Sequence, residues 1–293
     1  MYSEISANKR KTWLIIAGFG VIIGLLGWIV SGIYSDPSFL YLAIGIGGVY
    51  ALIQYFAAAK IALAMNGAQE VTKRQAPRLY RTVENLSIAT GIPMPKVYII
   101  DDPAPNAFAT GRDPKHAVVA ATTGLLGMMD DSELEAVMAH EMGHVRNYDI
   151  RVMMIVFGLV SAIGIIADMI MRMFWWGGGR DDDNQPNPLL IVLGIAAAVL
   201  APIVAMLIQL AVSRRREYLA DSTGALTTRY PEGLIRALQK IQGHGSGMRR
   251  QNTATAHLFF ASPLKGASLT RFFSTHPPIE DRIKRLKEMG RHA

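Results

Sequence analysis

The sequence predicts an α-helical integral membrane protein with four transmembrane helices and an α+β domain in the surrounding water. Three observations favour this fold class. Hydrophobic residues make up 51% of the 293 residues and charged residues only 18%, against roughly 25% charged in a typical soluble domain. Four apolar runs are long enough to cross a bilayer, which takes about 20 residues of helix. The polar segments between and after them carry helix-capping, turn and short-strand patterns.

The four apolar runs divide the chain. They cover about 13–33, 39–59, 152–176 and 189–212. We therefore expect an N-terminal tail and hairpin in 1–59, a first part of the water-exposed domain in 60–151, a second hairpin in 152–212 and a second part of the domain in 213–293. The first run follows basic residues, as a signal peptide does, but it exceeds the usual apolar length of about 7–15 residues. We interpret it as a retained membrane anchor.

The basic residues predict the orientation of all four spans. Lysine or arginine precedes the first and third runs and follows the second and fourth, whereas the turn 34–38 has neither and the segment 177–188 is net acidic. Because cytoplasmic loops are enriched in lysine and arginine, we expect both termini and residues 60–151 on the cytoplasmic side of the plasma membrane. The same bias explains the net charge of +7 more simply than nucleic-acid binding, so no nucleic-acid partner is expected.

One acidic residue, Asp168, lies within the third run. A carboxylate in hydrocarbon is costly and marks a candidate transport residue. Arg172 follows one helical turn later, and two tryptophans mark the nearby interface. An ion pair near the membrane surface is therefore the alternative interpretation.

The polar segments predict a mixed α+β domain. A helical pattern over 64–90 ends at the breaker "GIPMP", and short strands are expected at 96–100, 106–111 and 116–122. Either Ser132 with Glu135 or Asp130 with Glu133 can form a capping box that opens the next helix, "ELEAVMAHEMGHVRN". Further helices are expected over 213–223 and at the C-terminus, after a loop at 243–257.

The string "HEMGH" in that capped helix indicates a metal site. His140 and His144 are four residues apart and project from one helical face, so they can chelate a single ion. Glu141 points about 100° away around the helix, where it can accept a proton from a metal-activated water. The alternative is a pair of half-buried histidines with structural partners.

A catalytic zinc usually takes three protein ligands and one open position, so a third ligand is needed. The chain has no cysteine, which leaves histidine, aspartate or glutamate. The segment "RRREYLAD" offers Glu217 as the ligand, with Asp221 one turn later to bind the free N–H of a ligating histidine. Alternatively, Glu217 is a solvated residue paired with Arg214 or Tyr218. This donor set suits one Zn²⁺ per chain, although cobalt or manganese would also fit.

Four motifs in order carry a family resemblance: "PNAFATG", "AHEMGHVRNYD", "EYLAD" and "STHPPIEDRI". Together they resemble the M48 family of zinc metallopeptidases, and in particular its membrane-bound members in bacteria and archaea. The resemblance covers nearly the whole chain. It implies a zincin (gluzincin-type) catalytic domain, with His140, His144 and Glu217 as ligands and Glu141 as the base. It also implies a role in membrane-protein quality control, with unfolded or damaged membrane proteins as substrates.

Other residues are weaker candidates. Asn106, Ala107, Phe108 and Ala109 would lie on an edge strand to which a substrate adds as an extended strand; a plain structural strand is the alternative. His276, before two prolines, can stabilise the oxyanion or pack against the C-terminal helix. Arg282 can anchor that helix to the catalytic core. Asp149 can orient a ligand or simply end its helix in solvent.

Three rival functions are disfavoured. An intramembrane protease would need its metal motif inside a span, and residues 132–147 are too polar for that. A non-catalytic scaffold would not need to keep the glutamate base together with all three ligands. A metal transporter would need polar residues in several spans, and Asp168 stands almost alone.

Overall fold

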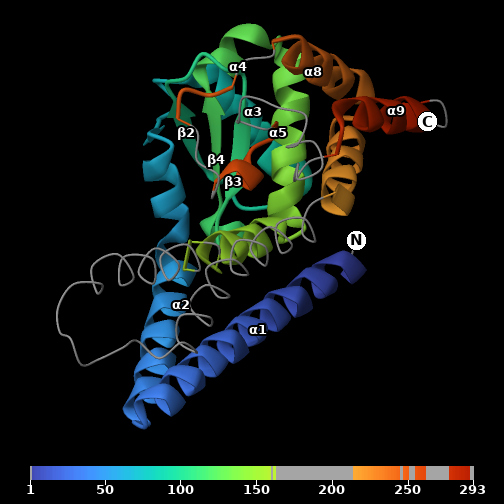
Figure 1. Ribbon diagram of the computed structural model, residues 1–293. Helices are drawn as coiled ribbons and strands as arrows, with labels where there is room; N and C mark the ends of the chain where they lie inside the picture. The colour runs from blue at the N-terminus through green and yellow to red at the C-terminus, as the bar shows by residue number, and fades with distance from the viewer. Residues whose placement is uncertain are drawn as a thin grey trace.

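The computed structural model describes residues 2–159, 161–162, 214–244, 247–250, 255–261 and 277–290. Helix α1 (Tyr2–Tyr34) and helix α2 (Ser38–Met65) form an N-terminal hairpin (Figure 1). They contain the first two predicted spans, and each helix extends beyond its span. The amide of Ser38 donates to the carboxylate of Asp36 at 2.9 Å in the turn between them. Because helix α2 ends only at Met65, it continues without a break past residue 60, where the sequence predicted a domain boundary.

The predicted membrane spans are described only in part. Among the described helices, one, α2, has the length and composition of a membrane span. Leu42, Ile46, Leu52 and Phe56 on this helix are exposed, as lipid-facing side chains would be. The third predicted span is described only over 152–159 and 161–162; the fourth and Asp168 lie outside the described residues. The four-span arrangement thus stays a prediction.

A small mixed sheet forms the centre of the polar domain. Its strands are β1 (Ala68–Glu70), β2 (Lys96–Ile100), β3 (Ala107–Thr110) and β4 (Val118–Thr122), in the order β1-β2-β4-β3. Strands β2 and β4 are parallel, and the two outer pairs are antiparallel. Phe108 faces Ala120 across the β3–β4 pair. The three strands expected from the sequence are present, and β3 lies at an edge.

The expectation of a continuous helix over 64–90 is wrong. Helix α2 ends at Met65, strand β1 follows, and helix α3 (Pro77–Thr90) begins anew. Gly67 has φ +66°, a left-handed conformation that glycine adopts without strain and that commonly ends helices. Pro77 occupies the first turn of α3, where its missing N–H leaves no hydrogen bond unmade. Both signals are visible in the sequence, but the apolar periodicity continued across them.

The remaining helices pack on one another beside the sheet. They are α4 (Thr123–Met128), α5 (Asp131–Arg146), α8 (Pro231–His244) and α9 (Ile279–Gly290), with two further helical stretches at 149–159 and 214–228. Helix α5 packs on β3 and α3, α8 packs on α5, and α9 packs on α8 (Figure 1). One hydrophobic core joins the sheet to the end of α2, where Ala58, Ala62 and Leu63 are buried.

Helix α5 begins at a capping box. Asp130 accepts a hydrogen bond from the backbone N–H of Glu133, whose carboxylate in turn accepts one from the N–H of Asp130. Of the two caps expected from the sequence, this one forms. Ser132 instead donates its hydroxyl to Asp130 at 2.7 Å. The cap satisfies backbone N–H groups at the start of α5 and sets the residue at which the helix begins.

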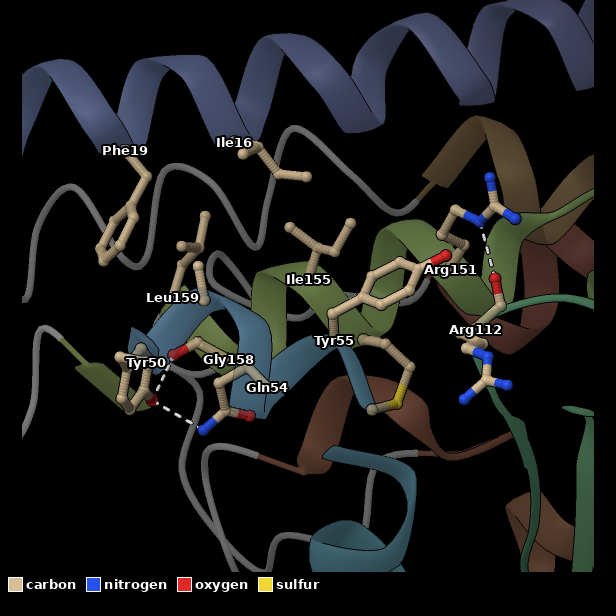
Figure 2. Close-up of a pocket in the computed structure, with 12 residues that line it drawn as sticks. Ile16, Phe19, Tyr50, Gln54, Tyr55, Arg112, Arg151, Ile155, Gly158 and Leu159 are labelled. Carbon is tan, nitrogen blue, oxygen red and sulfur yellow. Dashed lines mark hydrogen bonds between the residues drawn. The ribbon is translucent and has the colours of Figure 1, made fainter. Parts of the chain in front are cut away.

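A cavity of about 50 Å³ lies between α1, α2 and residues 149–159 (Figure 2). Tyr50 donates its hydroxyl to the backbone oxygen of Gly158 and accepts a hydrogen bond from Gln54. Farther along, Arg151 donates to the backbone oxygen of Arg112. The Tyr50 contact fixes the hairpin to the helix that follows α5. The Arg151 contact joins that helix to the segment after β3.

Candidate active site

Helix α5 places two histidine rings next to each other, nearly perpendicular at 88°. His140 and His144 are buried, and their Nε2 atoms lie 3.1 Å apart. Their spacing of one helical turn produces this arrangement, as the sequence predicts. Glu141 lies between them in the chain and is also buried. A buried cluster of this polarity requires partners for each ring nitrogen.

The stretch 214–228 brings Glu217 to the same point. Its carboxylate oxygens lie 3.7 Å from His140 Nε2 and 3.4 Å from His144 Nε2. One potential ligand atom from each of the three residues lies within 4.8 Å of the others. The structure thus brings together the three residues that the sequence nominates as metal ligands, although Glu217 lies more than 70 positions after the histidines.

Close packing of two helices sets this distance. A Cβ added at Gly224 would lie 3.0 Å from the backbone nitrogen of His140, closer than nine in ten real Cβ contacts. A side chain there would require the backbone of α5 to shift. The role of Gly224 was not predicted from the sequence. Its signal was the small residue seven positions, about two helical turns, after Glu217, which puts both residues on one face of the helix.

Each histidine has a carboxylate on its other nitrogen. Asp221 Oδ1 lies 2.9 Å from His140 Nδ1, and Asp149 Oδ2 lies 3.0 Å from His144 Nδ1. Both carboxylates are buried. When both rings are neutral and donate their Nδ1–H groups to these oxygens, both Nε2 lone pairs face the common point beside Glu217. This is the orientation that a metal-binding imidazole requires.

Arg282 on α9 binds Asp221, the carboxylate that holds His140. Its Nε and Nη2 donate to the two oxygens of Asp221 at 2.9 and 2.7 Å. Its Nη1 donates to the backbone oxygen of Phe260, and the guanidinium stacks on that ring. At 1% exposure, this charge is fully removed from water and is balanced by Asp221. The expected anchoring of the C-terminal helix therefore runs through a carboxylate that also holds His140.

Burial and neighbouring charges shift the pKa values of Glu141, His140 and His144 by different amounts. Burial raises the pKa of Glu141 to about 7, with Glu217 contributing. Burial lowers the pKa of His140 to about 4, against the opposing effect of Asp221. Burial also lowers the pKa of His144, but Asp149 and Glu217 outweigh it and raise that pKa to about 10. A carboxyl with a pKa near neutrality suits general acid–base work.

Strand β3 lies beside the cluster with its edge partly covered. Phe260 donates its N–H to Ala107 O at 2.8 Å, and Phe108 forms a bridge with Phe259. Asn106 exchanges two hydrogen bonds with the backbone of Ala261. The proposed substrate-binding residues 106–109 are thus paired, over part of their length, with the chain's own residues 259–261. His276 lies outside the described residues.

The donor set fits a divalent metal. Two imidazole nitrogens and a carboxylate converge, both imidazoles are oriented through their second nitrogens, and the described ligands include no thiolate. Nitrogen and oxygen ligands of this kind are typical of hydrolytic zinc sites.

Comparison with known proteins shows the family to which the chain belongs. Residues 73–290 match the profile of Peptidase family M48. The chain belongs to this family. The M48 chain is 56% identical over 290 residues to the protease HtpX homolog of Tropheryma whipplei (strain Twist), covering 99% of both chains. It is 46% identical over 298 residues to the protease HtpX homolog of Streptococcus thermophilus (strain ATCC BAA-491 / LMD-9), covering 99% of this chain and all of that one.

A solved structure has a similar fold. The crystal structure of S. mikatae Ste24p superposes with a TM-score of 0.54 at 20% identity, over 98% of this chain and 67% of that chain. The M48 chain is therefore an HtpX-type metallopeptidase associated with membranes, which confirms the family predicted from the four motifs.

Proposed function

We propose that this chain is a zinc-dependent endopeptidase that hydrolyses peptide bonds of misfolded or damaged membrane proteins at the cytoplasmic face of the plasma membrane. The observation that carries the proposal is the convergence of His140, His144 and Glu217, with each histidine held by a carboxylate and Glu141 beside them. In this arrangement His140, His144 and Glu217 would hold the metal. When bound, zinc supplies Lewis-acid polarisation of the scissile carbonyl and activation of water.

The chain's own residues move the proton. Glu141 accepts the proton of the attacking water and later donates it to the leaving amine, a role that its pKa near 7 suits. Asp221 and Asp149 keep the two imidazoles in the tautomer with the proton on Nδ1. Arg282 holds Asp221 and thereby His140. His276 is retained as a proposed oxyanion stabiliser.

Strand β3 is the proposed binding site for the substrate backbone. It is an edge strand that packs on α5, and residues 259–261 already pair with it as an extended peptide would. We infer that a substrate replaces this segment along residues 106–109. Asn106→Ala removes both hydrogen bonds to Ala261, so the KM for extended peptides should fall while kcat changes little. An unchanged KM would contradict this assignment.

The cytoplasmic position of the site follows from the distribution of basic residues and can be tested directly. Since the chain contains no cysteine, single cysteines report accessibility without background. Lys115→Cys, on an exposed turn of the catalytic domain, should react with a membrane-impermeant thiol reagent only after the membrane is opened. Asp36→Cys, in the α1–α2 turn, should react in intact cells. The opposite pattern would reverse the topology.

Metal content tests the proposed site. Full-length wild type and Glu217→Ala are purified in detergent, and their zinc content and cleavage of a membrane-protein substrate are compared with and without a chelator. We expect about one zinc in the wild type and loss of both zinc and cleavage in Glu217→Ala. Cleavage by wild type that survives chelation would refute a metal-dependent mechanism.

A further inference from the structure

The N-terminal helix reaches the metal cluster. Asn8, on α1, donates its side-chain amide to Asp149 Oδ1 at 2.8 Å and to the backbone oxygen of Asn147 at 2.9 Å. Asn8 is 2% exposed, and Asp149 is 0% exposed. The contact joins residues 141 positions apart. Asn8 precedes the apolar part of α1, so its burial is not explained by the membrane span.

The two carboxylate oxygens of Asp149 have different partners, His144 and Asn8. Oδ2 receives the Nδ1–H of His144, and Oδ1 receives the amide of Asn8. The nearest cation to Oδ1 among the described ion pairs is Arg216, with its Nε at 3.9 Å, beyond hydrogen-bonding distance. Asn8 is therefore the donor that fixes the rotation of this carboxylate. A carboxylate that orients a ligating histidine depends on its own hydrogen bonds.

The segment that carries Asp149 needs such support. Tyr148 has φ +61°, a conformation that is strained for a residue with a bulky side chain. The Lys9 ammonium lies 4.8 Å from the centre of the Tyr148 ring. Asn8 donates to the backbone oxygen of Asn147, the residue before Tyr148. Two consecutive residues of α1 thus hold the turn between α5 and the next helix.

Helix α1 is itself held in place farther along. Phe19 packs with Ala162 and with Leu159, which lies on the helix that follows this turn. Figure 2 shows Ile16 and Phe19 pointing from α1 towards Ile155 and Leu159. Because α1 is fixed at both points, its N-terminal end cannot move without disturbing Asp149.

We propose that Asn8 is a positioning residue of the metallopeptidase site: through Asp149 it holds the imidazole of His144 in its metal-binding orientation, so that the helix of the first predicted span is a structural part of the active site. This inference rests on the proposed function, since it assumes that His144 binds the metal.

The test measures zinc affinity by competition with a chromophoric chelator, on the full-length protein in detergent. Asn8→Ala should weaken zinc binding about tenfold, the lower end of the loss seen when support of a ligand is removed. Asn8→Asp keeps the shape but replaces the donor with a second carboxylate facing Asp149, so its affinity should fall further. Equal affinity in wild type and Asn8→Asp would overturn the proposal.

A double-mutant cycle separates positioning from general stability. In the Asp149→Asn background, Asn8→Ala should change zinc affinity less than about twofold, because the route to His144 is already broken. Independent, additive losses would contradict the proposal. Thr12→Val is the matched control: it removes another buried hydrogen bond of α1, to Asn8 O, without touching Asp149. It should lower the melting temperature and leave zinc affinity unchanged.

The same zinc-affinity assay separates the role of Asn8 from the proposed metal site. If Glu217→Ala loses zinc while Asn8→Ala and Asn8→Asp bind it normally, the metal site stands and the role of Asn8 is wrong. If Glu217→Ala binds zinc as tightly as wild type, the proposed metal site itself is wrong.

Discussion

Asp221 accepts a hydrogen bond from His140 Nδ1 at 2.9 Å while both of its oxygens are bound by Arg282. This carboxylate is therefore shared between a proposed metal ligand and the C-terminal helix. The pKa of Asp221 is lowered because Arg282 and His140 outweigh the effect of burial. It therefore stays ionised at neutral pH and continues to accept all three hydrogen bonds, one from His140 and two from Arg282.

Replacing Asp221 should weaken the metal site without removing a ligand. Asp221→Asn keeps the size of the side chain but removes its charge and replaces one acceptor oxygen with an NH2 donor. It cannot accept from Arg282 and His140 as Asp221 does, so His140 is held less firmly. We expect a 10- to 100-fold loss of zinc affinity, about the range seen for partners of ligating histidines. Chelator competition measures it. Affinity equal to that of the wild type would show that His140 is oriented by other contacts.

Arg282 should matter chiefly for stability. Removing it leaves Asp221 as a buried charge without its main partner, which typically costs about 3–5 kcal/mol. Arg282→Ala should therefore show a large decrease in melting temperature, and Arg282→Lys a smaller one because the ammonium keeps the charge but not the two-pronged geometry. Arg285→Ala is a control on the same helix: Arg285 stacks on Tyr218, and among the described contacts it has none with the metal cluster. An equal decrease in all three variants would contradict the assignment.

The pH dependence of stability should reveal His144. In protein freed of metal by chelation, its pKa in the folded state is about 10, above the value near 6.5 of an unfolded histidine. The stabilisation is thus fully present below about pH 6.5 and is lost as the pH rises through about 10. The melting temperature of metal-free protein should fall from pH 7 to pH 9.5, and His144→Gln should flatten that decline. Since zinc must displace this proton, zinc affinity should rise over the same interval.

Gly224 offers a test of the packing that sets the ligand distance. A methyl group there would press on the backbone of His140 and push residues 214–228, which carry Glu217, away from α5. We expect Gly224→Ala to lose zinc affinity and activity together. Gly243→Ala on α8, where a Cβ meets nothing within 4 Å, should behave like the wild type. Normal zinc binding by Gly224→Ala would show that the two helices can separate without cost to the site.

The sequence predicted which residues gather in the cluster better than it predicted the elements around them. His140, His144 and Glu217 could be named because metal chemistry restricts both the residue types and their spacing on a helix. Strand β1 was missed because three residues give no measurable alternation, and the helical periodicity on either side concealed the break at Gly67.

The residues that bind Asp149 and Asp221, the two carboxylates behind the histidines, could not be predicted from local sequence. Asn8 and Asp149 are 141 residues apart, and nothing in the local sequence of either indicates a partner. Arg282 was expected to anchor its helix, but its bond to Asp221 depends on how α9 packs against α8 and the core. Such contacts arise from tertiary packing, which local patterns do not encode.

The most direct test of the central claim is the cleavage activity of zinc-loaded Glu141→Gln, measured on a membrane-protein substrate with zinc content determined on the same sample. The substitution keeps the size of the side chain and leaves the three proposed ligands in place, but it removes the group that accepts the proton. We predict a full zinc complement and no detectable cleavage. Cleavage at the wild-type rate by a zinc-loaded Glu141→Gln protein would contradict the assignment of Glu141 as the base.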